Sequence, residues 1–246
     1  MLKPTRNAFL ALPLALLLAL STLAAAETHK GGLDTKDTKT LQEASAVLNA
    51  LTNAPDKGIP HELMAKANCI LIFPNVAKGA FIVGGKAGKG VASCRQADGK
   101  MSPPAFYEIG GASVGWQIGG QSADMVLLIM NDSGVSHLLS DKFTIGAEAA
   151  ATAGPVGRTA QAATDAQLHA QILSWSRSKG LFVGAALDGS VVKPDKEANE
   201  ALYGSPVSGT EILVNTKLTT PARARSLMQT INRHMGAGAQ EAAKKS

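Results

Sequence analysis

The segment from Ala67 to Arg95 restricts the possible fold more than any other stretch of the chain. It predicts three short strands, Cys69–Phe73, Ala80–Gly84 and Gly90–Cys94. Each is rich in apolar residues that favour strands and ends at Pro74-Asn75 or at glycines, which commonly separate strands. A sheet is therefore expected to begin here.

The charge of this region is of one sign. Between positions 63 and 97 there is no acidic residue, whereas the basic residues are Lys66, Lys78, Lys86, Lys89 and Arg95. A sheet whose turns and edges carry only positive charge suits contact with an anionic surface. Lysines at sheet edges also serve simply to discourage strand-to-strand aggregation, and charge alone favours this second interpretation.

The first 26 residues have the pattern of a secretory signal peptide. Lys3 and Arg6 precede an apolar stretch, Phe9–Leu20, and Ala24-Ala25-Ala26 offers a cleavage site before Glu27. The protein is therefore expected to be periplasmic or secreted, the alternative being an uncleaved N-terminal anchor. Loss of the two basic residues lowers the formal net charge from +5 to +3, which is not the balance of a nucleic-acid-binding protein.

The rest of the chain is expected to form one domain over residues 38–235, between a flexible N-terminus, 27–37, and a flexible tail, 236–246. The predicted fold class is α+β: a large, twisted, mainly antiparallel sheet, either open or closing toward a barrel, with N-terminal, late and C-terminal helices. Besides the strands above, the predicted elements are helices at Thr38–Leu51, His61–Lys66, Val135–Ser140, Pro194–Tyr203 and Ala222–Met235, strands at Ala105–Ile109, Ala112–Ile118, Asp124–Met130 and Thr144–Ala153, and a hairpin of Leu168–Ser176 with Leu181–Leu187.

The helix predicted over Thr38–Leu51 is amphipathic, and its N-cap is expected at Thr38 or Thr40. Such a helix most often covers one face of a sheet. It can also lie on a membrane interface. In that case its contacts would come from Lys36, Lys39, Leu41, Leu48 and Leu51.

The two cysteines, Cys69 and Cys94, fall at the start of the first predicted strand and at the end of the third. A disulfide suits an exported protein. Two buried thiols fit the sequence equally well, because sequence does not show whether the Cα atoms come within the roughly 4.4–6.8 Å that a disulfide needs.

Two glycine-rich stretches match catalytic or phosphate-binding motifs only in part. Gly111–Gly115 has the G-x-S-x-G spacing, but strand-like alternation continues beyond it, so Ser113 is not expected at a nucleophile elbow, and a hydrolase is the weakest hypothesis. Gly84–Gly90 lacks the spacing of a Walker loop, although a turn there could hold one phosphate beside Lys86 and Lys89. The histidines and acids form no metal-ligand or paired-carboxylate pattern, and no cofactor is expected.

Four phrases, in the same order and spacing, resemble the SYLF lipid-binding domain family. They are IFPNVAKGAFIVGGKAGKGVASCR, PAFYEIGGASVGWQIGGQSADMVLLIM, KFTIGAEAAATAGPVGR and ILSWSRSKGLFVGAALDG. The resemblance runs from about Leu41 to Gly204. It implies a non-enzymatic domain that binds anionic lipids, with a contribution from the helix that precedes the strands.

For an exported bacterial member, the resemblance points to phosphatidylglycerol, cardiolipin or phosphatidic acid as ligands at a periplasmic membrane face. The expected phosphate contacts are basic residues at turn tips, namely Lys86, Lys89, Arg177 and Lys179. The alternative is a structural protein of the envelope that binds a protein partner. The actin-related roles of eukaryotic members are not expected to transfer to an exported chain.

Overall fold

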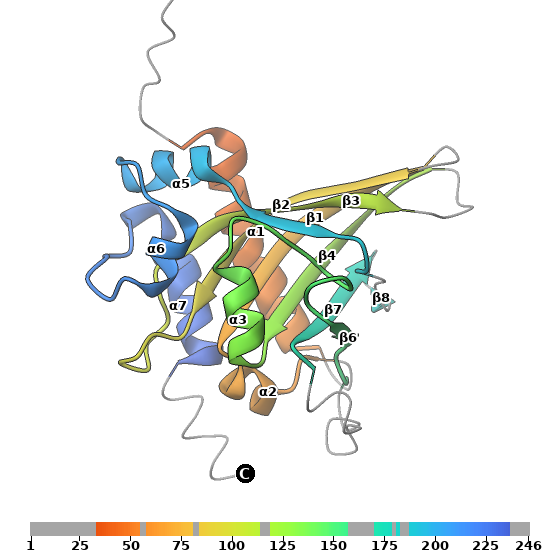
Figure 1. Ribbon diagram of the computed structural model, residues 1–246, viewed down its shortest axis with the longest axis horizontal. Coiled ribbons are helices and arrows are strands. Elements are labelled where there is room, and N and C mark those ends of the chain that lie inside the picture. Colours follow the sequence, from red (N-terminus) through yellow and green to blue (C-terminus); the bar gives the residue numbers. More distant parts are fainter. Residues whose placement is uncertain are drawn as a thin grey trace, which may run out of the picture. The chain divides into compact units, whose positions relative to one another are not determined.

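The computed structural model describes residues 33–54, 58–80, 84–113, 119–156, 170–178, 181–182 and 187–236. Helices pack on both faces of one curled sheet in this part of the chain (Figure 1), so the predicted α+β class is confirmed. The strands are β1 (Cys69–Ala80), β2 (Gly84–Cys94), β3 (Ala105–Ser113), β4 (Gly119–Ile129), β5 (Phe143–Thr144), β6 (Ala151–Ala153), β7 (Ile172–Ser178), β8 (Leu181–Phe182) and β9 (Val191–Pro194).

The strand order is β5-β9-β3-β2-β1-β4-β7-β6, with β8 paired to β7. The described pairs are antiparallel except for β6 with β7, which agrees with the prediction of a mainly antiparallel sheet. Over the described strands the sheet is open, and β5 and β6 form its two edges. Both edge strands are very short, which limits the backbone available for pairing with another chain.

The helices are α1 (Thr35–Thr52), α2 (His61–Lys66), α3 (Asp132–Leu138), α5 (Lys196–Tyr203), α6 (Gly209–Val214) and α7 (Arg225–Met235), with a 3-10 turn, η2 (Ala222–Ala224), before α7. Most of them confirm predicted helices, whereas α6 and strand β9 were not predicted. Helix α1 begins earlier than expected, because the side chain of Asp34, and not that of Thr38 or Thr40, accepts a hydrogen bond of 2.6 Å from the Asp37 N–H and caps the helix. None of the helices described has the length and hydropathy needed to cross a bilayer.

Two of the three short strands predicted at the start of the sheet, Cys69–Phe73 and Gly90–Cys94, are parts of two longer strands, and residues 81–83 of the remaining one lie outside the described residues. Strand β1 continues through Pro74-Asn75, because a bulge there absorbs the proline and a positive φ of 52° at Asn75. The register of β1 shifts at this bulge toward both β2 and β4. Gly84–Gly90 is part of strand β2 and does not form the turn that was considered as a holder of one phosphate.

Other glycines also lie within strands or in turns that sequence did not predict correctly. Strand β3 runs unbroken through Gly110-Gly111 to Ser113, so this serine lies in a strand as expected, while residues 114–118 lie outside the described part. The single strand predicted at Thr144–Ala153 is instead two short strands, because Gly146, at φ 88°, turns the chain between them.

Side chains alternate between two apolar layers, one on each face of the sheet. Ile70 and Ile72 of β1 pack with α1, α2 and α7, whereas Leu71 and Phe73 pack with α3 and α6. The central strand predicted at Asp124–Met130 is confirmed as the buried half of β4. The sheet therefore has two covered faces, and α1 is one of the elements that cover it.

The β1–β2 register places Cys69 directly opposite Cys94, and a disulfide joins them. Their Cα atoms are 4.0 Å apart, and both residues are buried. Of the two alternatives that the sequence left open, the structure shows the disulfide. It ties the start of β1 to the end of β2.

Candidate functional site

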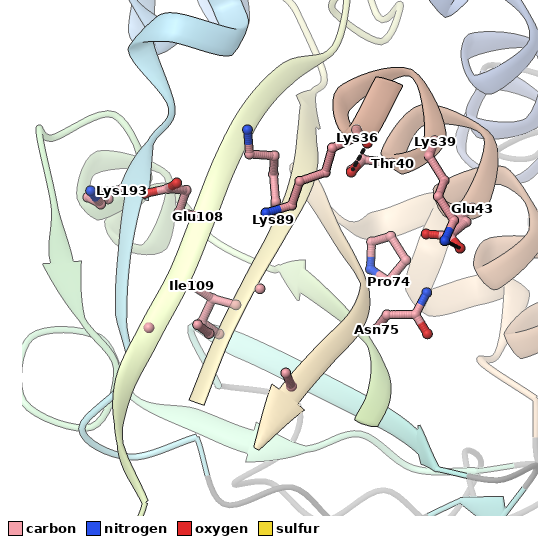
Figure 2. A pocket seen from close by; sticks show the side chains of 14 residues that line it. Lys36, Lys39, Thr40, Glu43, Pro74, Asn75, Lys89, Glu108, Ile109 and Lys193 are labelled. Carbon is pink, nitrogen blue, oxygen red and sulfur yellow. Dashed lines mark hydrogen bonds and ion pairs between the residues drawn. The ribbon is translucent and has the colours of Figure 1, made fainter. Parts of the chain in front are cut away.

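A groove of about 760 Å³ lies between α1 and the sheet. Lys36, Lys39 and Glu43 of α1 form one wall, and Glu108 of β3 and Lys193 of β9 form the other (Figure 2). The groove exists because α1 covers the inner part of this sheet face and leaves the outer part open. Its walls therefore carry both lysines and glutamates from three separate elements.

The floor of the groove is formed largely by residues with small side chains. Ala77, Ala87 and Gly110 lie in one row across β1, β2 and β3, and both alanines are exposed. A Cβ at Gly110 would meet only the Lys86 carbonyl oxygen, at 3.8 Å, so packing does not require a glycine in this row. A flat floor of this kind allows a ligand to approach the strands closely.

Lys89 lies at the base of the groove and holds two elements together. Its Nζ atom lies 2.6 Å from Oδ1 of Asp37, in the first turn of α1, and 2.7 Å from Oδ2 of Asp195, the N-cap of α5. Both carboxylates are buried. Burial lowers the pKa of Lys89, but hydrogen bonds and Coulombic attraction to Asp195 and Asp37 outweigh it, so the pKa lies above its ordinary value and the lysine is charged.

The pairs on the rim are more exposed and therefore weaker. Lys39 lies 3.4 Å from Glu43, and Lys193 lies 2.9 Å from Glu108, a hydrogen bond that raises the pKa of Lys193. Exposed pairs of this kind contribute roughly 0–1 kcal/mol each. Lys36 is exposed, extends toward β2 in Figure 2, and has no ion pair with any residue in the described part.

Counted with Asp37 and Asp195, the lysines of the groove are matched by an equal number of carboxylates. The groove is thus formally neutral, although β1 and β2, which form most of its floor, carry only basic charged residues. An anion can reach Lys36 directly. To reach the other lysines it must displace a carboxylate.

The predicted apolar contacts, Leu41, Leu48 and Leu51, all lie in the core against the sheet and α7. They cover the sheet, which is the commoner of the two roles considered for this helix. In this conformation they do not face solvent. Lipid contact through these leucines remains a prediction, and it would require α1 to move away from the sheet.

The predicted turn-tip cations are not brought together. Lys86 lies within β2 and is buried; burial and nearby Lys78 lower its pKa, against an opposing effect of Asp188. Arg177 lies 2.9 Å from Asp124 on the neighbouring strand, and Lys179 lies outside the described residues. Lys36, Lys39 and Lys89 are the predicted basic residues that line the groove.

Sequence reasoning did not find Asp37, Asp195, Glu108 or Lys193 as parts of the site. Asp195 carried a usable local signal, because an aspartate directly before a helix is a common N-cap. Its pairing with Lys89 had no such signal. The described residues also contain no cluster of three or more potential metal ligands.

The far end of α1 is held by His234 of α7. The Nε2 atom of His234 lies 3.2 Å from Oδ1 of Asn49 and 3.4 Å from Oγ1 of Thr52, and its Nδ1 is buried without a hydrogen-bond partner among the described groups. His61 of α2 stacks on it with ring centroids 6.1 Å apart. Burial, His61 and Arg233 together lower the pKa of His234, so the ring is neutral in the folded state.

This arrangement predicts acid sensitivity. The folded-state pKa of His234 lies below its unfolded value of about 6.5. The contribution of the neutral ring to the free energy of unfolding is therefore fully present above that value, and it is lost as the pH falls from there through the folded-state pKa. Urea unfolding of the wild type should therefore show a decrease in stability between about pH 7 and pH 5 that is smaller in His234→Gln. Equal decreases in the two proteins would contradict the prediction.

Comparison with known proteins places the chain in a family. A family model described as "Ysc84: Las17-binding protein actin regulator" matches residues 110–234, which extend from β3 to α7. Human SH3 domain-containing YSC84-like protein 1 is 30% identical over 198 residues, which cover 80% of this chain and 57% of that protein. LAS seventeen-binding protein 3 of Saccharomyces cerevisiae is 32% identical over 170 residues, which cover 68% of this chain and 37% of that protein.

The chain thus spans about half the length of the relatives that it matches, or less. These relatives are named as binding or regulatory proteins and not as enzymes. The matched region contains Lys193 and Asp195 of the groove as well as nearly all of α7. The matches and the four sequence phrases agree, and the chain belongs to the Ysc84, or SYLF, family.

Proposed function

We propose that this protein is a non-enzymatic, exported binding protein that takes anionic phospholipid at a periplasmic membrane face. The observation that carries the proposal is the groove beside α1, where Lys36 has no carboxylate partner among the described residues and three further lysines, each paired with a carboxylate, line the same groove. A phosphate diester suits Lys36. The flat floor beside it suits the glycerol or acyl portion of a lipid.

Export is part of the proposal. The signal peptide predicted for residues 1–26 lies outside the described part of the chain. The Cys69–Cys94 disulfide supports export, because such bonds persist in oxidising compartments and are rare in the cytosol.

The proposal predicts which lysines matter for membrane binding. Co-sedimentation with vesicles of graded phosphatidylglycerol content should show binding that rises with anionic lipid and falls with salt. Because each basic residue near an anionic surface contributes about 1 kcal/mol, Lys36→Glu/Lys193→Glu should weaken binding at least about tenfold. The matched control, Lys142→Glu/Lys217→Glu, changes net charge equally at exposed lysines that do not line the groove and should have a much smaller effect.

Two results would count against this assignment. Equal loss in both double variants would show that binding depends on overall charge and not on the groove. No wild-type binding at either low or physiological salt would reject lipid binding and favour the second candidate, an envelope protein that binds a protein partner. The names of the relatives, which refer to Las17 binding, support that second candidate.

A further inference from the structure

We propose that the Asp37–Lys89–Asp195 cluster is a latch on α1, and that the phosphate of a bound lipid head group opens it by replacing Asp37 at Lys89. This inference rests on the proposed function, since it concerns how the same groove responds to its ligand. The ligand displaces the contact of Asp37 with Lys89 and so releases the first turn of α1.

The cluster holds more negative than positive charge. One ammonium group faces two carboxylates at 2.6 and 2.7 Å, and both side chains are more than nine-tenths buried. Two like charges held this close repel each other, so one of the two carboxylates can leave and the remaining one still forms a balanced pair with Lys89. A phosphate diester carries the same charge as a carboxylate, and its exchange for one of them leaves the charge of the cluster unchanged.

The two carboxylates are not equally fixed. Asp195 also accepts a hydrogen bond of 3.0 Å from the Ala198 N–H and so caps α5, in addition to its contact with Lys89. Among the described residues, the Asp37 carboxylate contacts Lys89 alone, and the Asp37 N–H is held separately by Asp34. Asp37 is therefore the carboxylate that can leave without loss of a helix cap.

The groove gives an entering phosphate access to the lysine and not to the acids. The Lys89 side chain is 18% exposed and lines the groove, whereas those of Asp37 and Asp195 are 7% and 6% exposed and do not line it. Lys36 precedes Asp37 in the chain, lines the same groove and has no ion pair in the described part. A phosphate bound first at Lys36 is thus delivered next to the contact that it replaces.

Release of Asp37 would free the first turns of α1 while the rest of the helix stays in place. Leu41 lies one turn after Asp37 and would be uncovered first. The second half of α1 is retained by the buried Leu48 and Leu51 and by the contacts of His234 with Asn49 and Thr52. The latch therefore gives a route by which the predicted apolar face reaches a bilayer after the head group has bound.

The test compares Asp37→Asn with Glu43→Gln, which removes one negative charge from the groove wall without touching the latch. Asp37→Asn leaves Lys89 and Asp195 as a balanced pair, so the fold is retained. On vesicles of phosphatidylcholine and phosphatidylglycerol, the full-length protein bearing Asp37→Asn should bind about tenfold more tightly than Glu43→Gln, because its lysine no longer has to exchange a partner. Equal affinities of the two variants would overturn the latch while leaving lipid binding intact.

Hydrogen exchange provides a second measurement that does not depend on affinity. Without lipid, amides of α1 in residues 38–42 should exchange faster in Asp37→Asn than in Glu43→Gln, whereas those in residues 47–52 should be unchanged. In the wild type, soluble glycerophosphoglycerol should produce the same local increase. If inorganic phosphate alone produces it as fully, the latch responds to free anions and not to lipid head groups. If neither variant nor wild type binds anionic vesicles, the proposed function itself fails.

Discussion

Replacement of Lys89 by methionine is expected to lower the free energy of unfolding by about 3–5 kcal/mol. The substitution keeps most of the side-chain volume but removes the cation that two buried carboxylates share. Asp37 and Asp195 would then face each other without compensation in a site that excludes most water. Urea denaturation followed by circular dichroism measures the loss.

The control for this prediction removes the charges together. Lys89→Met/Asp37→Asn/Asp195→Asn leaves no buried charge in the cluster, and Asn is as good an N-cap as Asp, so most of the lost stability should return. If the triple variant is as unstable as the single one, Lys89 acts through packing and not through charge.

Loss of the disulfide is expected to have the second largest effect. Cys69→Ala/Cys94→Ala should lower the free energy of unfolding by about 3 kcal/mol, because the bond closes a loop with a sequence separation of 25 and so restricts the unfolded chain. The two residues are buried, one at the start of β1 and the other at the end of β2, so the variant also loses apolar contacts there.

Reduction provides the matched comparison for the disulfide. Dithiothreitol should lower the urea midpoint of the wild type and leave that of Cys69→Ala/Cys94→Ala unchanged. A wild-type midpoint that does not respond to the reductant under unfolding conditions would show that the bond is absent from the protein. That result would also remove one support for the proposed export.

The sequence predicted those parts of the fold whose signals are local. Helix α5 begins after an aspartate cap at Asp195 and ends at Gly204, which adopts the left-handed conformation that favours glycine. The continuous apolar run of β4 and the four-residue spacing of Leu227, Ile231 and Met235 in α7 were equally readable. The long strand β1 was not, because Pro74-Asn75 is a turn signal in isolation and becomes a bulge only when strands on both sides hold it in the sheet.

The groove could be predicted only in part. The basic residues of the β1–β2 region were visible, but the acids that neutralise them come from distant elements, as the 52 positions between Asp37 and Lys89 illustrate. A charge count within one segment therefore overstated its positive potential. The same long-range pairings distinguish Lys36 from the other lysines of the groove. Each of the others pairs with a carboxylate, whereas Lys36 has no such partner among the described residues.

The packing around the first described helix, α1, is completed by the last one, α7. Helix α1 packs along α7, and its first turn is tied to the start of α5 through Lys89. A ribosome that has made α1 and most of the sheet has not yet made α5 or α7, so α1 is held by the sheet alone until synthesis is nearly finished. Such a chain remains open to chaperones throughout its production. Folding can be completed only once its C-terminal part has been made.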